Sequence, residues 1–388
     1  MSKIDELISE LCPEGVNIFE LGEVVRIRNG RDFKHLGTGT VPVYGSGGVM
    51  QHVSESFHEG PSVLIPRKGS LGNLFFVDIP FWTVDTIFYT EVGDALEPKY
   101  FFYFLKTKDL ASMNFAGGVP SLTQTMLNKV SIPIPPLEVQ REIVSILDKF
   151  TQLEAELEAE LEARRSQYEH TRDQLLDFSG DLSSHPLRER IAELCPEGVQ
   201  FYKMADVLQR KKGAPVTAQS MKSLLKGDGS VRVFAGGRTL VDVDSGALAE
   251  NLVISGPGII VKSRGIIEFA FWEGLFSHKN ELWSYVAKSR KLDLKFAYFY
   301  LLTKTEEFRS LARSKSVKMP QLATPDTDEY RIPIPPLEVQ REIVSILDKL
   351  DALVNDLTFG LPAEISARRK QHEYYRNQLL TFKELDAA

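Results

Sequence analysis

The chain has 388 residues, of which 43% are hydrophobic and 26% are charged, and its formal net charge is −7. This composition is typical of a globular protein, and the length suits two domains better than one. No run of about 18 apolar residues occurs and the N-terminal MSKIDELISELCPEG carries acids, so we expect no membrane span, no signal peptide and a cytoplasmic location.

Charge is distributed unevenly along the chain. Residues 132–194 carry a net charge of −7 and residues 195–331 carry +6, whereas residues 12–131 carry −2. Segregated charge says more about binding partners than the total does. The overall negative charge therefore does not exclude a nucleic-acid partner.

Residues 1–131 predict a globular domain of mixed α/β structure, which we call the first head. Short β-rich runs at Ser62–Pro66, Leu74–Val77 and Thr86–Tyr89 are separated by Gly-rich turns. An amphipathic helix is predicted near residues 98–110, and its aromatic side chains are expected in the core.

Residues 132–180 predict a long helix. Apolar residues recur in steps of three, four or seven from Val139 to Leu175, a period of about 3.5 that is typical of a coiled coil. The pair Pro135-Pro136 suits the start of this helix, where a missing N–H costs nothing. A polar helix with one narrow apolar seam needs a partner helix.

The second half of the chain repeats this order. Residues 181–331 predict a second head, with β-rich runs at Leu252–Ile254 and Ile259–Val261 and a helix near 294–311. Residues 332–388 predict a second long helix. Its Phe359-Gly360-Leu361-Pro362 segment predicts a kink or break.

Two phrases occur in both halves. The 18 residues IPIPPLEVQREIVSILDK at Ile132–Lys149 recur unchanged at Ile332–Lys349, and LCPEGV occurs around Cys12 and around Cys195. We expect the two cysteines to be equivalent buried residues rather than a disulfide or a zinc site. The expected fold is α/β (α+β), a pseudo-two-fold tandem repeat of two globular heads separated by two long antiparallel coiled-coil helices.

This arrangement resembles the specificity subunit of type I restriction–modification systems. The resemblance rests on two variable heads, each followed by IPIPPLEVQREI and a long helix that ends in ARRxQxExxRxQLL. It implies that each head is a target recognition domain that reads one half of a bipartite, asymmetric site in double-stranded DNA. It also implies that the helices set the spacing and bind two modification subunits, and that two restriction subunits complete the nuclease.

No catalytic motif was found in the sequence. It lacks DPPY and NPPF, the phosphate-loop pattern GxxxxGK[ST] and a convincing PD-x(n)-ExK nuclease motif, and its histidines are scattered without ligand spacing. We therefore expect no enzymatic activity and no cofactor in this chain. The resemblance places S-adenosylmethionine, ATP and Mg²⁺ in the partner subunits.

Phosphate contacts require lysine and arginine on one surface. The candidate DNA-binding residues of the first head are Arg26, Arg28, Arg31, Lys34, Arg67 and Lys68. Those of the second head are Arg210, Lys211, Lys212, Arg232, Arg238, Lys262, Arg264, Lys279, Arg313, Lys315 and Lys318. We expect Arg67 with Lys68, before Gly69, to match Lys262 with Arg264, before Gly265, and the more basic second head to bind phosphates more strongly.

The long helices carry the residues expected to dock partners and to set the spacing. The docking candidates are Gln140, Arg141, Arg164 and Arg165 in the first copy and Gln340, Arg341, Arg368 and Arg369 in the second. One Leu-Glu-Ala-Glu unit adds about 6 Å and turns a helix about 40° beyond a full circle. Because one base pair turns DNA by about 35°, an added unit is expected to widen the gap between half-sites by about one base pair.

Two alternatives remain open. The chain could be the recognition subunit of a related assembly in which one partner carries both methylation and cleavage. It could also be a coiled-coil scaffold whose heads bind protein. Duplication followed by exchange of one head would leave the same pattern of similar helices and different heads.

Overall fold

The computed structural model describes residues 2–113, 121–215, 229–237, 239–244, 246, 248–316 and 318–385. It forms two compact units, Met1–Ala159 with Ala363–Ala388 and Glu160–Pro362. Each unit takes in a head together with parts of two long helices. The predicted domain boundaries, which separate heads from helices, therefore divide the chain differently from its compact units.

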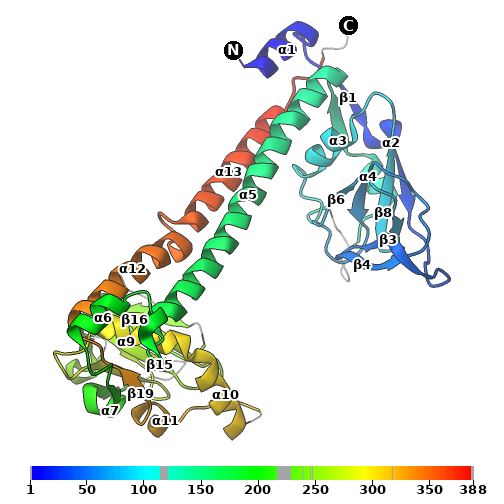
Figure 1. Cartoon of the computed structure of the whole chain (residues 1–388). Helices are drawn as coiled ribbons and strands as arrows, with labels where there is room; N and C mark the ends of the chain where they lie inside the picture. The colour runs from blue at the N-terminus through cyan, green and yellow to red at the C-terminus, as the bar shows by residue number, and fades with distance from the viewer. Residues whose placement is uncertain are drawn as a thin grey trace. The chain divides into compact units, whose positions relative to one another are not determined.

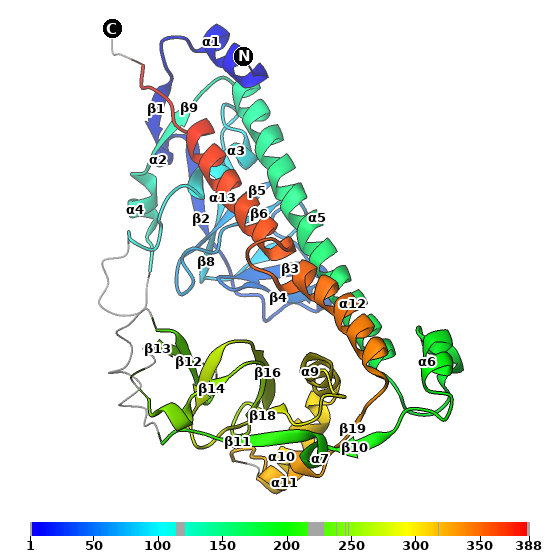
Figure 2. The same ribbon diagram turned by 90° about the vertical axis from the view of Figure 1, so that its left-hand side faces the viewer.

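The first unit contains a four-stranded antiparallel sheet in the order β2-β8-β5-β6, a three-stranded sheet in the order β4-β3-β7, and the pair β1-β9 (Figure 2). Its strands are β1 (Asn17–Glu20), β2 (Val25–Asn29), β3 (Thr38–Gly45), β4 (Gly48–Val53), β5 (Ser62–Pro66), β6 (Phe75–Val77), β7 (Trp82–Thr83), β8 (Ile87–Val92) and β9 (Ser131–Ile134). Its helices are α1 (Lys3–Leu11), α2 (Leu21–Val24), α3 (Pro98–Leu105), α4 (Gln124–Asn128), the first part of α5 (Leu137–Leu176) and most of α13 (Leu361–Leu379).

The core of the first unit lies around β5 and α3. Every residue of β5 is buried, as expected for a central strand with a continuous apolar run. Pro98 starts α3 at a position where its missing N–H is no loss, and Tyr100, Phe101 and Phe104 of this helix are buried beside Val139 of α5. The prediction that these aromatic residues form core is confirmed.

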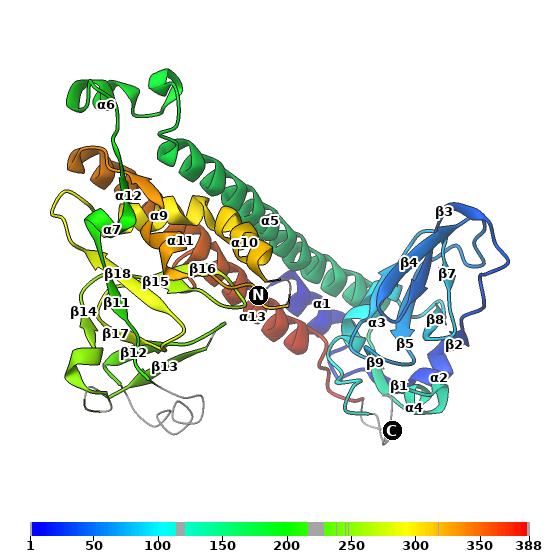
Figure 3. The same cartoon turned by 90° about the horizontal axis from the view of Figure 1, so that it is seen from below.

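The second unit repeats this topology, with one more strand, β14, in its second sheet. Its four-stranded sheet has the order β11-β18-β15-β16, and its second sheet has the order β13-β12-β17-β14 (Figure 3). β10 pairs with β19. Its strands are β10 (Phe201–Lys203), β11 (Leu208–Lys212), β12 (Val231–Phe234), β13 (Leu240–Val243), β14 (Ile254–Ser255), β15 (Gly258–Lys262), β16 (Glu268–Trp272), β17 (Leu275–His278), β18 (Trp283–Ala287) and β19 (Arg331–Pro333). Its helices are η1 (Leu182–Ser184), α6 (Arg188–Leu194), α7 (Met204–Val207), η3 (Glu250–Leu252), α9 (Leu294–Thr303), α10 (Thr305–Lys315), α11 (Thr324–Asp328) and α12 (Leu337–Asn355), with the last part of α5.

The predicted tandem repeat is therefore confirmed at the level of topology, although the two heads differ in sequence. Strand order and pairing direction agree in the main sheets, and both β9 and β19 lead directly into a long helix (Figure 2). Figure 1 shows the strands and helices of each unit in a second view. Cys12 and Cys195 cap equivalent short helices and are free thiols, the first buried and the second half-buried.

The two long helices differ in continuity. Helix α5 is unbroken over 40 residues, whereas the second copy divides into α12 and α13. In the gap the Oδ1 atom of Asp356 accepts hydrogen bonds from the backbone N–H groups of Thr358 and Phe359. A Cβ on Gly360 would lie 2.6 Å from the Ala352 carbonyl oxygen, so the chain requires glycine there. The predicted break is confirmed.

Candidate nucleic-acid interface and partner surface

One basic turn is built in the same way in both heads. Lys68 forms a β-bridge with Ser121 and Arg264 forms one with Gln321, and each is followed by a glycine in the left-handed region, with φ of 83° at Gly69 and 74° at Gly265. A left-handed residue is strained unless it is glycine, which explains the shared glycine. The turn thus presents one exposed cation in each head.

The predicted match between the two turns was wrong by one position. The Arg67 carbonyl accepts a hydrogen bond from the Leu122 N–H, and the Ser263 carbonyl accepts one from the Leu322 N–H, so Arg67 corresponds to Ser263. Lys262 ends β15 and is only 9% exposed, and its Nζ atom lies 3.0 Å from a carboxylate oxygen of Glu268. Burial and this ion pair therefore disfavour the predicted contact between Lys262 and phosphate.

The cations of the first head lie mostly on the surface. Alternation along β2 buries Val25 and Ile27 and leaves Arg26 and Arg28 exposed. Arg28 lies 3.4 Å from the Glu91 carboxylate. The other candidates differ in exposure: Arg31 (exposed, 5.3 Å from the Phe57 ring centre), Lys34 (exposed), Arg67 (half-buried, 5.8 Å from the Phe88 ring centre) and Lys68 (exposed).

The second head neutralises much of its own positive charge. Its internal ion pairs are Arg210 with Asp328 at 3.2 Å, Arg232 with Asp242 at 2.8 Å, Lys279 with Glu281 at 2.6 Å, and Lys315 with Asp326. Hydrogen bonds from Arg232 lower the pKa of Asp242, so this pair stays charged on both sides. Among the described residues, Lys211, Lys212, Arg313 and Lys318 have no ion-pair partner, and Arg238 lies outside the described residues. The number of basic residues in this head therefore overstates the number of cations that are available for phosphates.

Each of the two repeated helices has one exposed face that does not pack against its head. In both copies the buried positions include Val139 and its equivalent Val339, which pack into the head. Four other positions are exposed and identical in both copies, at intervals of three or four residues along one helix face. They are Glu138, Arg141, Ser145 and Lys149 on α5 and Glu338, Arg341, Ser345 and Lys349 on α12. We call these two surfaces the repeated helix faces.

Gln140 and Gln340 do not belong to these faces. Both side chains are fully buried. The Oε1 atom of Gln140 accepts a hydrogen bond from the Glu97 N–H at 2.8 Å, and its Nε2 donates to the carbonyls of Ala95 at 2.9 Å and Pro135 at 2.8 Å. Gln340 makes the same three bonds in the second unit. Full burial disfavours the predicted docking role of these glutamines, since each fastens a long helix to its own head.

The other arginines proposed for docking lie on exposed helix surface. Arg164 and Arg368 form ion pairs within their own helices, with Glu160 and Glu364, both at 3.5 Å. Arg165 is exposed. Arg369 binds Glu158 of α5, so it contributes to helix pairing within the first unit. A docking role for these residues stays a prediction.

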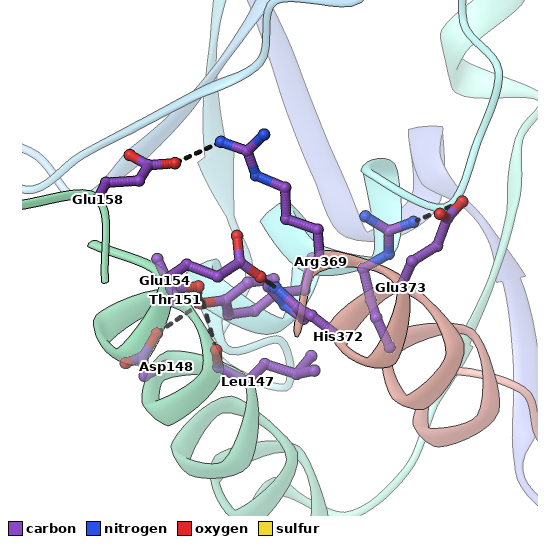
Figure 4. A network of polar contacts seen from close by, with 10 residues as sticks. Leu147, Asp148, Thr151, Glu154, Glu158, Arg369, His372 and Glu373 are labelled. Atoms are coloured by element: carbon purple, nitrogen blue, oxygen red, sulfur yellow. Dashed lines mark hydrogen bonds and ion pairs between the residues drawn. The ribbon is translucent and has the colours of Figure 1, made fainter. Parts of the chain in front are cut away.

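Within the first unit α13 packs on α5 in antiparallel fashion. Arg369 lies beside Glu158, and the Nδ1 atom of His372 lies 2.7 Å from the Glu154 Oε1 atom (Figure 4). Phe150 stacks on the His372 ring with centroids 5.5 Å apart. Partner numbers fall on α5 as they rise on α13, which confirms the predicted antiparallel pairing in this unit. The sequence did not reveal the His372–Glu154 pair, because its partners lie more than 200 positions apart.

The second unit pairs its helices with different side chains. Tyr168 of α5 is buried in the core cluster that also contains Val354 of α12, and burial raises the pKa of its phenol. The guanidinium of Arg172 lies 5.7 Å from the Tyr168 ring centre. Helix pairing therefore involves different side chains in the two units. The first unit uses the His372–Glu154 contact and the stacked Phe150, and the second uses the buried Tyr168.

The described residues contain no cluster of three or more side chains that could hold a metal ion. Nor does any helix in the described part of the chain combine the length and the apolar character that crossing a membrane requires. The polar groups of the molecule are arranged as ion pairs, caps and exposed cations.

The comparisons with known proteins agree with this geometry. A family model for the type I restriction modification DNA specificity domain matches residues 13–163 and 196–367. The chain is 27% identical over 373 residues to a putative type I restriction enzyme specificity subunit of Haemophilus influenzae, covering 89% of each chain. It is 30% identical over 307 residues to the EcoR124I/EcoR124II specificity subunit of Escherichia coli, covering 73% of this chain and 70% of that one. The crystal structure of a type I restriction–modification S subunit from M. genitalium has the same fold, with a TM-score of 0.63 at 16% identity over 94% of this chain and 96% of that one.

Fold and surface define an internally repeated protein in which two heads of one topology are each fixed to a long helix. The chain belongs to the family of type I restriction–modification DNA specificity subunits. The resemblance inferred from the repeated phrases and the predicted fold class are both confirmed.

Proposed function

We propose that this chain is the DNA-recognition subunit of a type I restriction–modification complex. Each head binds one half of a bipartite, asymmetric site in double-stranded DNA, and the long helices set the distance between the halves. The observation that carries this proposal is the contrast between the parts: the two heads share one topology but differ in sequence, whereas the repeated helix faces are identical.

The repeated helix faces support two identical docking sites. An exposed side chain contributes little to the fold, so its identity in two copies calls for another cause. A chain with internal two-fold repetition offers the same surface twice and can bind two copies of one partner. In this proposal the partner is the modification subunit, which supplies methyl transfer.

No activity is assigned to the chain itself. S-adenosylmethionine serves the two modification subunits, and ATP and Mg²⁺ serve the two restriction subunits that complete the nuclease. The location is the cytoplasm, where the DNA lies. The heads contribute phosphate contacts through the basic turn at Lys68 and Arg264.

The test combines the purified chain with the modification subunit of the same system. Native mass spectrometry is expected to show one chain with two modification subunits, and sequencing of modified bases is expected to show methylation of one bipartite site only. Binding of the partner without any methylation or DNA binding would contradict the proposal and favour a protein scaffold. A single partner chain that both methylates and cleaves would place the protein in the related type of assembly.

A further inference from the structure

The hairpin β3–β4 of the first head is uncharged, and its strand β4 is exposed. Residues 38–54, TGTVPVYGSGGVMQHVS, contain no Asp, Glu, Lys or Arg, although 26% of the chain is charged. All four side chains from Val49 to His52 are exposed, with Val49 at 50% and Met50 at 60%. Exposed apolar side chains on a strand indicate a contact surface rather than a solvated one.

The pairing of the hairpin directs these side chains outward. Among the described strands, β4 lies at the edge of its sheet, with β3 on one side only. Val43 lies opposite Gln51 and Tyr44 lies opposite Val49, which leaves Met50 as the extra residue of a β-bulge. Bulges redirect side chains and are frequent beside functional sites. The Met50 sulfur lies over Gly45, where a Cβ would come within 2.7 Å of it.

Cations lie at both ends of this ribbon. At the tip, the Nδ2 atom of Asn73 donates a hydrogen bond to the Ser46 carbonyl at 3.4 Å, which brings the turn that begins with Lys68 beside the hairpin. At the base, the Ser54 N–H donates to the Gly37 carbonyl at 2.8 Å, which fixes the end of the loop 31–37 that carries Arg31 and Lys34. Figure 1 shows β3 and β4 together at the end of the first unit that is distant from α1.

The positions of the charged and uncharged residues match the two kinds of protein–DNA contact, to phosphates and to base edges. Contacts from lysine and arginine to phosphates position a protein without reading sequence. Base edges are read by hydrogen bonds and apolar contacts, which neutral side chains supply as well as arginine and lysine. A two-stranded antiparallel ribbon fits into the major groove of B-DNA. The glutamine amide can pair with the N6 and N7 atoms of adenine, and an apolar side chain can contact the thymine methyl group.

We propose that the β3–β4 ribbon of the first head enters the major groove and that Met50, Gln51 and His52 determine which bases this head reads. This inference rests on the proposed function and specifies its reading element. Lys68 and the loop 31–37 hold the flanking phosphates. Residues Met50 to His52 determine specificity, and Lys68 contributes affinity.

The second head differs at the same place in its fold. Its hairpin β12–β13 carries the Arg232–Asp242 ion pair across the strands, with two hydrogen bonds of 2.8 Å, and Arg232 lies 4.0 Å from the Trp272 ring centre. Val241, which aligns with Gln51, is buried at 7% exposure. The two hairpins therefore offer different surfaces, and a change in the first affects only one half of the site.

The test uses the full chain in complex with its modification subunits and follows methylation rates on a set of DNA duplexes that vary one base pair at a time. We expect Gln51→Ala to lower discrimination at one base pair of one half-site by about tenfold to a hundredfold, the range that one base-edge contact supplies. Met50→Ala and His52→Ala are expected to relax other positions of the same half-site. The other half-site and the gap stay unchanged.

Two control variants make the result specific. Thr125→Ala changes an exposed side chain of α4 in the same head and is expected to alter neither sequence preference nor rate. Lys68→Ala is expected to weaken binding to all sequences alike and to reduce the salt dependence of binding by about one unit. The melting temperature of all variants should match the wild type, because the changed side chains are exposed.

The outcomes separate this inference from the proposed function. If Gln51→Ala, Met50→Ala and His52→Ala all retain the wild-type sequence preference while the wild-type complex methylates a bipartite site, the ribbon does not read bases and the proposed function stands. A uniform loss across all sequences, like that of Lys68→Ala, would also overturn the reading role. If the wild-type complex methylates no bipartite site, the proposed function itself fails.

Discussion

Replacing Gln140 by alanine should loosen the first head from its helix. The amide group makes three hydrogen bonds, to the Glu97 N–H and to the carbonyls of Ala95 and Pro135, at 2.8–2.9 Å. Truncation leaves all three backbone groups without this partner, and each buried bond contributes about 1 kcal/mol net. We therefore expect a loss of about 3 kcal/mol, which lowers the melting temperature of a unit of this size by about 6–12 °C.

The assay combines thermal unfolding with hydrogen exchange measured by mass spectrometry. Exchange should rise in the connection between β8 and α3, where Glu97 and Ala95 lie, and remain unchanged in the second unit. Gln340→Ala should give the mirror result, with faster exchange near Asp293 and Lys291, which Gln340 binds. Each variant thus serves as the control of the other.

Two further variants test the reasoning. Glu138→Ala removes an exposed neighbour on the same helix and should shift the melting temperature by no more than about 2 °C, as surface substitutions usually do. Gln140→Glu keeps the acceptor for the Glu97 N–H but turns an oxygen toward two carbonyls, so it should destabilise at least as much as alanine. A melting temperature of Gln140→Ala equal to that of the wild type, together with loss of partner binding, would refute the structural role and restore the docking role.

Four other outcomes are expected. Arg141→Glu or Arg341→Glu alone should leave one modification subunit bound per chain, and the double variant should bind none, as counted by native mass spectrometry. Two subunits bound to the double variant would show that the repeated helix faces are not the docking sites. Lys68→Ala should reduce the slope of log binding constant against log salt by about one, whereas Lys262→Ala should leave the slope unchanged and lower the stability, because only the first cation is exposed. One Leu-Glu-Ala-Glu unit inserted into α5 should widen the gap between the half-sites by about one base pair and leave the bases of both halves unchanged. Mapping of methylated bases measures this gap, and an unaltered gap would show that the helix does not set it. Burial lowers the pKa of His278, so at mildly acidic pH the unfolded chain binds a proton that the folded chain does not. The free energy of unfolding should therefore rise with pH up to about 6.5, the ordinary pKa of histidine, and decrease as the pH falls below that value. In urea unfolding of His278→Gln, the free energy of unfolding should depend less steeply on pH between about pH 5 and 7.

Much of the helical architecture could be predicted because its signals are local. The apolar period and the Pro-Pro start identified α5, and glycine with proline identified the break between α12 and α13. Two cysteines in one repeated phrase predicted free thiols at equivalent positions, which the structure confirms. The strand runs at Ser62–Pro66 and Ile259–Val261 were also located, because buried strands read as continuous apolar runs.

The site was predicted less well, because exposure depends on contacts between distant residues. Lys262 and Lys68 look alike in sequence, each beside a glycine-containing turn. Only the sheet decides that one lies inward beside Glu268 and the other outward in the turn. The uncharged ribbon at residues 38–54 was visible in the sequence as a gap in charge, but its significance needed the exposure of both faces of β4.

Sequence alone determined that this protein is a tandem repeat with two different heads and two copies of one helix, since repetition and period are written in neighbouring residues. Tertiary structure alone decided which part of each copy is inside. Gln140 and Arg141 are adjacent and are both repeated in the second copy, yet the first is buried against a loop 45 residues earlier in the chain and the second faces solvent. A helix turns about 100° per residue, so neighbouring positions point in different directions, and only the packing of the head against the helix selects the buried one.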